Sequence, residues 1–312
     1  MFFWHYTSVF RYLCIMNRYR LAMKMQLVVN SISRALVLAS MMVAMVLLAG
    51  CRKEVCSHKP YTIGEGKHKA VATIEPLRYF VSRIGGEEWE VAVTVPRGFS
   101  PEEFMPSASQ MVDLAQAECL FKVGELGFET TWLNDALEEM ENLQVYDTSA
   151  GINRATFDPH TWTSPHNVKI ICTNIAKALA EVDAGRADVY KARLEKTLAT
   201  VDSVDNVLRG LLVEVPSRSF VIAHPALSLF AEEYGLKQIA IEADGKEPTA
   251  ASIENLIAQA KKDSVKVIFV QEEFSEQSAL VIAAETGAKI VKINPLAYDW
   301  PSEMIRIGRA LK

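Results

Sequence analysis

The strongest constraint on the fold is an alternation of short apolar segments with helical patterns. In the first half of the chain, apolar segments typical of buried strands occur at Ala70–Ile74, Glu90–Val95, Cys119–Val123 and Leu143–Tyr146. Helical patterns accompany them at Pro76–Ile84, Ser107–Glu118 and Thr131–Met140. Strands and helices that take turns in this way favour a parallel sheet with crossover helices.

The same alternation returns after residue 216. Strands are expected at Ser219–Ala223, Gln238–Glu242, Val265–Val270 and Lys289–Ile293, and helices at Ala226–Tyr234, Ser252–Lys262, Ser275–Thr286 and Ser302–Leu311. Between the two alternating regions lie two helical patterns with almost no breakers, Asn167–Val182 and Arg186–Val213. The second of these spans roughly 40 Å as one helix, which is longer than a single small domain needs.

The sequence therefore predicts an α/β fold of two lobes joined by a long rigid helix. Each lobe is expected to hold a mainly parallel four-stranded sheet with flanking helices. The predicted bounds are 70–166 for the N-terminal lobe, 167–215 for the helical region and 216–312 for the C-terminal lobe.

Residues 1–50 have the pattern of an export signal. They contain five basic residues and no acidic residue, and Ala35–Ala49 is an uncharged apolar run. Such a run is short for a membrane span and suits the core of a signal peptide. An uncleaved anchor helix is the alternative. Because residues 1–22 fit neither part of a signal, we expect translation to begin at Met23 or Met25.

The signal ends in Leu48-Ala49-Gly50-Cys51, which resembles the lipobox of bacterial lipoproteins. We therefore expect Cys51 to carry lipid as the first residue of the mature chain, and residues 51–69 to form a polar tether. The protein is then exported and anchored to a bacterial membrane, where it faces the periplasm or the cell exterior.

The charge and the cysteine content limit which binding partners the protein is suited to. The chain has 33 basic and 38 acidic residues, and five of the basic ones lie in the signal, so residues 51–312 carry a net charge of −10. An acidic exported protein is a poor partner for nucleic acid and a suitable one for cations. The cysteine spacing indicates neither a disulfide framework nor a thiolate metal site.

Polar residues follow several of the predicted strands. In open α/β sheets, ligands bind beyond the carboxyl ends of the strands. In the C-terminal lobe, such ends are occupied by His224, Asn294 and the pair Glu272 and Glu273. In the N-terminal lobe, Glu102 follows the second strand, and His160, in FDPHTW, follows the fourth. We expect these metal-competent groups to face each other across a cleft, with Trp162 and Tyr298 on its wall.

Five stretches carry a resemblance to a known family. They are VATIEPLRYFVSRIGG, TVPRGFSPEEFMPSASQMVDLAQAE, FDPHTWTSPHNVKIICTNIAKAL, FVIAHPALSLFAEEYGLKQIAIEADGKEP and KIVKINPLAYDW, in that order. Together they resemble the substrate-binding lipoproteins of zinc and manganese ABC importers. The resemblance implies two α/β lobes bridged by a long helix, with a metal ion held between the lobes.

The resemblance also implies a set of ligands. His160 matches the histidine of the family's DPH motif, and His224 matches that of its HPA motif. Glu102 stands where the family commonly has histidine, and Asn294 stands where an aspartate is frequent. Glu272 and Glu273 are weaker candidates. The segment 147–157 lacks the histidine-rich loop that many members carry.

Two imidazoles and a carboxylate with a weak fourth ligand suit Zn²⁺. Asparagine in place of aspartate disfavours Mn²⁺, whereas glutamate in place of histidine favours it, so a Mn²⁺- or Fe²⁺-binding protein remains an alternative. We expect a monomer without catalytic residues that captures Zn²⁺ and delivers it to an ABC permease.

Two other classes of protein are alternatives. A zinc-dependent hydrolase shares this ligand chemistry, although the sequence has no HExxH motif. The other is a surface lipoprotein with a decayed metal site that serves in cell adhesion.

Overall fold

A computed structural model describes residues 66–153, 158–242 and 248–312. All of them belong to one compact unit, residues 60–312. The predicted export signal, the lipid on Cys51 and nearly all of the tether lie outside the described residues. Within the described part of the chain, every helix is too short or too polar to span a membrane.

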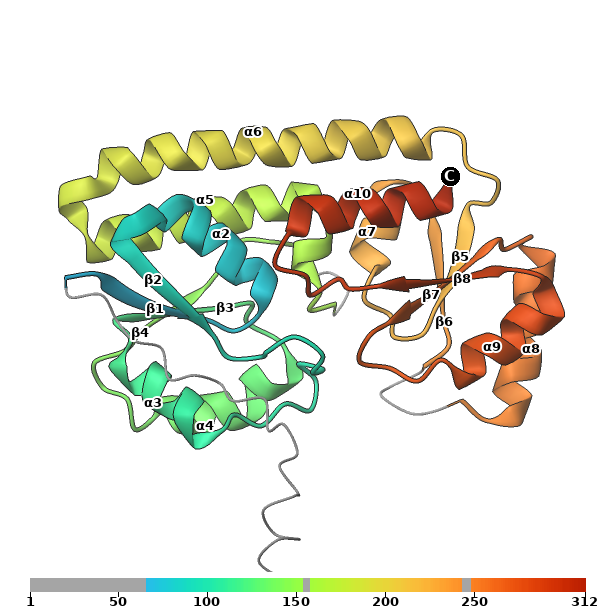
Figure 1. Cartoon of the computed structure of the whole chain (residues 1–312), viewed down its shortest axis with the longest axis horizontal. Helices are drawn as coiled ribbons and strands as arrows, with labels where there is room; N and C mark the ends of the chain where they lie inside the picture. Colours follow the sequence, from blue (N-terminus) through green and yellow to red (C-terminus); the bar gives the residue numbers. More distant parts are fainter. Residues whose placement is uncertain (1–65, 154–157, 243–247) are drawn as a thin grey trace, which may run out of the picture. The chain divides into compact units, whose positions relative to one another are not determined.

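The N-terminal lobe is built on a four-stranded parallel sheet in the order β2-β1-β3-β4. Parallel strands buried on both faces read as continuous apolar runs, which is why these segments stand out in the sequence. In Figure 1, α2 covers one face of this sheet, while α3 and α4 lie on the other. The strands are β1 (His68–Ala72), β2 (Trp89–Val93), β3 (Cys119–Lys122) and β4 (Gln144–Asp147), and the helices are α2 (Glu75–Gly85), α3 (Ala108–Gln116) and α4 (Asn134–Leu137).

The C-terminal lobe repeats this plan with a parallel sheet in the order β6-β5-β7-β8. Counted from the first strand of each lobe, the two orders are the same. The strands are β5 (Ser219–Ile222), β6 (Lys237–Ala240), β7 (Val267–Gln271) and β8 (Lys289–Ile293), and the helices are α7 (Ser228–Glu233), α8 (Ala250–Lys262), α9 (Gln277–Thr286) and α10 (Trp300–Leu311).

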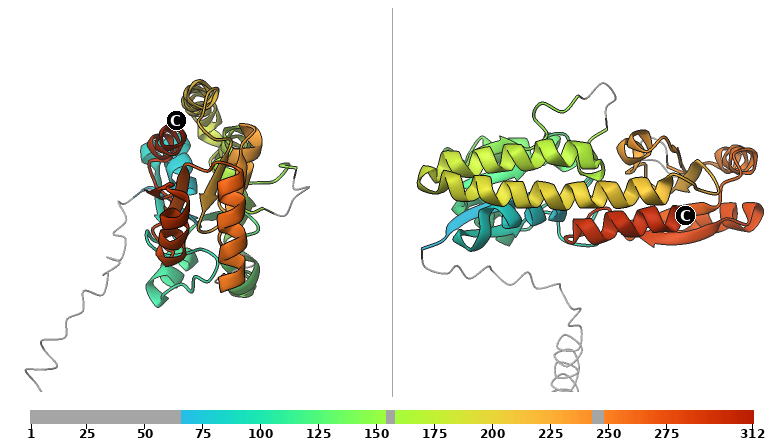
Figure 2. Two further views of the ribbon diagram at one scale, coloured as in Figure 1. Left: turned by 90° about the vertical axis from the view of Figure 1, so that its right-hand side faces the viewer. Right: turned by 90° about the horizontal axis from the view of Figure 1, so that it is seen from above.

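Two long helices connect the lobes, α5 (Pro165–Val182) and α6 (Ala187–Leu212). With 26 residues, α6 is about 39 Å long. It packs against α5 and α2 and, further along, against α10 of the C-terminal lobe (Figure 2). The predicted two-lobed α/β fold with a long connecting helix is confirmed.

The apolar core is continuous between the lobes. One cluster of buried side chains includes Phe80 of α2, Leu208 of α6, Phe220 of β5 and Trp300 of α10. The rings of Phe80 and Trp300 meet edge to face with their centroids 5.4 Å apart. Because separating the lobes would expose this surface, the fold resists a wide hinge movement.

The helix expected at 131–140 is present in part: it begins with a π-helical turn and ends at Leu137. A single π-helical turn, Glu129–Leu133, leads into α4, which has only four residues. The segment begins at Glu129, whose buried carboxylate accepts hydrogen bonds from the backbone N–H groups of Val123 and Gly124 at 3.0 and 2.6 Å. This bonding holds the start of the segment against the end of β3.

Candidate metal site

The loop after β4 presents His160 at the start of a 3₁₀ turn, Thr161–Thr163. The carboxylate of Asp158 accepts the backbone N–H of His160 at 2.9 Å and lies 2.8 Å from its Nδ1 atom. Burial alone would raise the pKa of Asp158, but the hydrogen bonds and positive charge offered by His160 outweigh it and leave that pKa lowered. The buried imidazole is therefore oriented by a carboxylate, with Nε2 directed away from it.

His224 lies two residues beyond β5 and is held in the same way. Its Nδ1 atom is 3.1 Å from the Glu242 carboxylate. Its ring stacks on Phe274, with an interplanar angle of 5° and 4.7 Å between centroids. Burial, followed by the neighbouring positive charge of His160, lowers the pKa of His224. The lowered pKa favours the neutral imidazole, the form that binds a metal ion.

A second set of bonds fixes the backbone of His224. The side chain of Gln271, at the end of β7, accepts the N–H of His224 at 3.2 Å and donates to its carbonyl oxygen at 2.6 Å. Strands β5 and β7 are the central pair of the C-terminal sheet, where the chain order reverses. Ligands of open α/β sheets bind at such a switch point.

Glu102 comes from the loop that follows β2. The backbone of this loop is tied to the segment after β3, because the N–H of Phe128 donates to the carbonyl of Pro101 at 3.2 Å. Gly127 makes the approach possible, since a Cβ atom there would overlap the carbonyl oxygen of Glu102. The Oε1 atom of Glu102 is buried and has no hydrogen-bond partner among the described residues. An unpaired buried carboxylate oxygen is costly unless a cation or donor reaches it.

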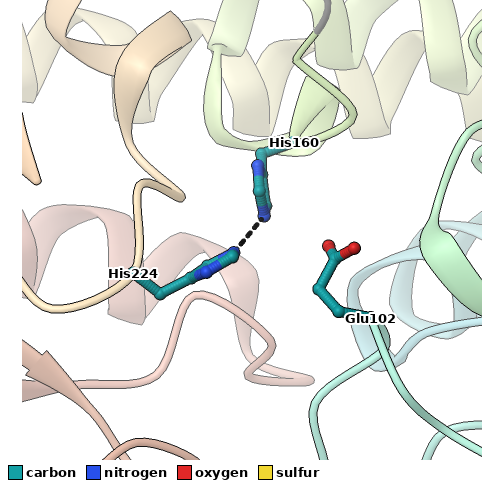
Figure 3. A group of neighbouring side chains, drawn as sticks. All are labelled: Glu102, His160 and His224. Carbon is teal, nitrogen blue, oxygen red and sulfur yellow. Dashed lines mark hydrogen bonds between the residues drawn. The ribbon is translucent and has the colours of Figure 1, made fainter. Parts of the chain in front are cut away.

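These three side chains converge between the lobes (Figure 3). One ligand atom from each of Glu102, His160 and His224 lies within 4.8 Å of the other two. The Nε2 atoms of the histidines are 3.3 Å apart. Two imidazoles bound to one tetrahedral Zn²⁺ at about 2.0–2.1 Å have nitrogens roughly 3.3 Å apart. The donor set and its spacing therefore fit a zinc ion.

Both Nδ1 atoms face carboxylates, which favours the tautomer with the proton on Nδ1. In that tautomer both Nε2 atoms keep a lone pair that can bind a cation between them. Carboxylate–histidine–metal chains of this kind are the usual support of zinc ligands.

The structure does not bring Asn294 into this group. Its Oδ1 atom accepts the N–H of Leu296 at 3.0 Å, and its Nδ2 atom faces the Glu272 carboxylate at 3.5 Å. Glu272 in turn accepts two hydrogen bonds from Arg97 of the other lobe, at 2.7 and 3.0 Å, which lower its pKa. Asn294, Glu272 and Arg97 line a separate cavity and link the two lobes there.

The two aromatic residues expected on the cleft wall lie in different places. Trp162 is buried and lines the pocket that contains His160 and His224. Its indole N–H donates to the carbonyl of Pro295 at 2.9 Å, which connects the lobes beside the site. Tyr298 is 40% exposed and lines the cavity of Arg97 instead.

Glu273, by contrast, lines the same pocket as the two histidines. Its Oε1 atom is buried without a hydrogen-bond partner among the described residues. Burial raises the pKa of this carboxyl group.

Sequence reasoning missed the residues that orient the histidines. Asp158 stands two places before His160, and its pairing could have been inferred from the Asp-Pro-His turn. Glu242 follows β6, and Phe274 follows β7; their contacts with His224 arise only when neighbouring strands pair. In the chain alone they have no distinguishing signal.

Two α/β lobes on a long helix, with imidazoles and a carboxylate converging between them, define a metal-binding member of the solute-binding proteins. The family described as "Zinc-uptake complex component A periplasmic" matches residues 70–304. The chain belongs to this family.

Several known proteins are similar to the chain. A crystal structure of ZnuA shares 35% sequence identity and superposes with a TM-score of 0.75, covering 78% of this chain and 97% of that one. "High-affinity zinc uptake system protein ZnuA" of Bacillus subtilis (strain 168) is 26% identical over 273 residues, 80% of this chain and 85% of that protein.

"Zinc-binding protein AdcA" of Streptococcus pyogenes serotype M3 is 27% identical over 275 residues, 78% of this chain and 53% of that protein. The chain thus spans about half the length of the streptococcal relatives that it matches.

Proposed function

We propose that this protein captures Zn²⁺ outside the cytoplasm and delivers it to the ABC permease of a metal importer. The observation that carries the proposal is the pair of Nε2 atoms, 3.3 Å apart, each on a ring whose Nδ1 faces a carboxylate. Family membership and the zinc-bound structure of a ZnuA deletion mutant, at 36% identity and a TM-score of 0.73, support it.

In this proposal His160, His224 and Glu102 bind the ion. The histidines already have tetrahedral spacing. The Glu102 carboxylate needs to approach them by roughly 1.5 Å at most, given the 4.8 Å limit on the group. Its loop can make this adjustment without a large movement of the lobes, whose shared core resists separation.

We further propose that Cys51 anchors the protein to a bacterial membrane by lipid and that it acts as a monomer. The lipobox-like sequence supports the anchor, as does the name "Zinc-binding lipoprotein AdcA" of a Streptococcus pneumoniae relative. We assign it no catalytic residue and no nucleic-acid partner.

The carboxylate at position 102 favours a second cargo, Mn²⁺, because a hard oxygen replaces an imidazole nitrogen. The affinities of the protein for Zn²⁺ and Mn²⁺, measured in competition, show which ion is the cargo. The alternatives of a hydrolase and of a decayed site are further outcomes of the experiment below.

The test is a titration of the purified, metal-stripped protein with Zn²⁺ and Mn²⁺ in competition with a calibrated chelator. We expect tight zinc binding that is lost in His160→Ala and His224→Ala. His166→Ala is the matched control, because His166 is exposed at the start of α5.

Weak binding of both ions, indifferent to the substitutions, would refute the proposal and favour a decayed site. Turnover of ester, phosphate or peptide substrates by the zinc-loaded protein would favour the hydrolase.

A further inference from the structure

A tetrahedral zinc site needs a fourth ligand beyond His160, His224 and Glu102. Asn294, which stands where the family often has aspartate, and the neighbouring Glu272 both make other hydrogen bonds. Asn294 uses its Oδ1 atom on the backbone of Leu296. Glu272 holds Arg97 through both of its carboxylate oxygens. Recruiting Asn294 would break its bond to Leu296, and recruiting Glu272 would break the ion pair that connects the lobes.

Glu273 is placed differently from its neighbour. It follows β7 at the switch point of the C-terminal sheet, next to the strand end that carries His224. It lines the pocket shared by His160 and His224, and also the wider cavity on the side of Glu102. Each of the three proposed ligands thus shares at least one cavity with Glu273, although Glu273 lies outside the group whose ligand atoms are within 4.8 Å of one another.

One carboxylate oxygen of Glu273 lacks a hydrogen-bond partner among the described residues. Its Oε1 atom is buried yet makes no hydrogen bond with the described residues, and the same holds for Oε1 of Glu102. Two buried, unpaired carboxylate oxygens at the edge of one pocket are unfavourable without a cation. A divalent ion between them would neutralise both charges.

We propose that Glu273 supplies the fourth ligand to the ion, in place of Asn294; this rests on the function proposed above. Two imidazoles and two carboxylates then form an N₂O₂ shell whose two negative charges balance the charge of Zn²⁺. Such a shell leaves no position for a reactive water, which is the property of closed rather than catalytic zinc sites. A second hard oxygen also brings the affinities for Zn²⁺ and Mn²⁺ closer than in a site of three imidazoles.

The experiment compares Glu273→Gln with the matched variant Glu272→Gln in the purified protein. We expect Glu273→Gln to weaken zinc binding by about tenfold or more, at least the loss that follows removal of a supporting carboxylate. Glu272→Gln removes the charge that pairs with the exposed Arg97 and leaves the pocket of the two histidines unchanged, so we expect less than about a fivefold change. Glu273→Asp keeps the anionic oxygen and should retain more affinity than Glu273→Gln.

A spectroscopic measurement separates coordination from a structural role. Co²⁺ loaded in place of Zn²⁺ reports its ligands through its visible absorption bands. We expect these bands to change in Glu273→Gln and to stay unchanged in Glu272→Gln.

Wild-type zinc affinity and an unchanged Co²⁺ spectrum in Glu273→Gln would overturn the inference. If His160→Ala still loses zinc in that case, the proposed function stands and only the fourth ligand is wrong. Equal losses in the Asp and Gln variants with an unchanged spectrum would also overturn it, since the residue would then act only on folding.

Discussion

Replacing Asp158 by asparagine tests whether the site depends on the carboxylates behind its histidines. The Asp158 side chain is 10% exposed and lies 2.8 Å from Nδ1 of His160. Asparagine has nearly the same shape and can still accept one hydrogen bond. It lacks the negative charge that orients the imidazole and makes Nε2 a stronger ligand. The substitution therefore removes charge with little change in packing.

Loss of such a supporting group typically weakens metal binding by about 10–100-fold, or about 1.4–2.8 kcal/mol. We expect Asp158→Asn near the upper end, because the carboxylate is buried and accepts both the ring and the backbone N–H of His160. Chelator competition with Zn²⁺ at pH 7.5 measures the change in Kd.

The matched control is Glu118→Gln, which removes the carboxylate 2.8 Å from Nδ1 of His68; neither residue lines the pocket. We expect its zinc affinity to equal that of the wild type. An unchanged Kd in Asp158→Asn would show that the ring of His160 is positioned by packing alone, and the reasoning about paired carboxylates would be wrong.

Three further predictions concern pH, the Glu102 loop and the contact between lobes. Burial, and then the neighbouring histidine, lower the pKa of His224 below its unfolded value of about 6.5, so the unfolded state binds more protons. The metal-free protein should lose stability as pH falls from 7.5 to 5.5, and urea denaturation should show a smaller loss in His224→Gln; equal losses would contradict this. Gly127→Ala introduces a Cβ against the carbonyl of Glu102 and should lower the free energy of unfolding by about 1–3 kcal/mol while weakening zinc binding, as measured by denaturation and chelator competition. Trp162→Phe leaves the carbonyl of Pro295 without its donor and should cost about 1–3 kcal/mol in the same denaturation assay; an unaltered midpoint would argue against this contact.

The sheets and the connecting helix could be predicted from the sequence because their physical cause is local. Buried parallel strands must be apolar throughout, and α6 has no proline and a single glycine, Gly210, in 26 residues. The π turn at Glu129–Leu133 could not be predicted in this way. It begins at a fully buried glutamate that binds backbone N–H groups, and glutamate is ordinarily exposed, so the sequence gives no sign of this arrangement.

The two histidines were predictable for a different reason. A parallel sheet brings the carboxyl ends of its strands to one edge, so a polar residue after each strand is a candidate whatever its partners are. The direction of a side chain at that edge is not predictable. Asn294 lies at a strand end as expected, but its amide turns toward Leu296 and Glu272. Tyr298 similarly covers Arg78, at 4.3 Å from the guanidinium carbon to the ring centroid.

The two lobes share one strand order, but their proposed metal ligands follow strands at different positions in that order. In the proposed site, Glu102 and His160 follow the edge strands β2 and β4 of the N-terminal lobe, whereas His224 and Glu273 follow the central pair, β5 and β7, of the C-terminal lobe. The central strand end is fixed by the bonds between Gln271 and His224. Surface loops tolerate substitution far better than paired strand ends do. We therefore expect a single exchange at position 102, such as glutamate to histidine, to change the metal preference at less cost in stability than an exchange at His224.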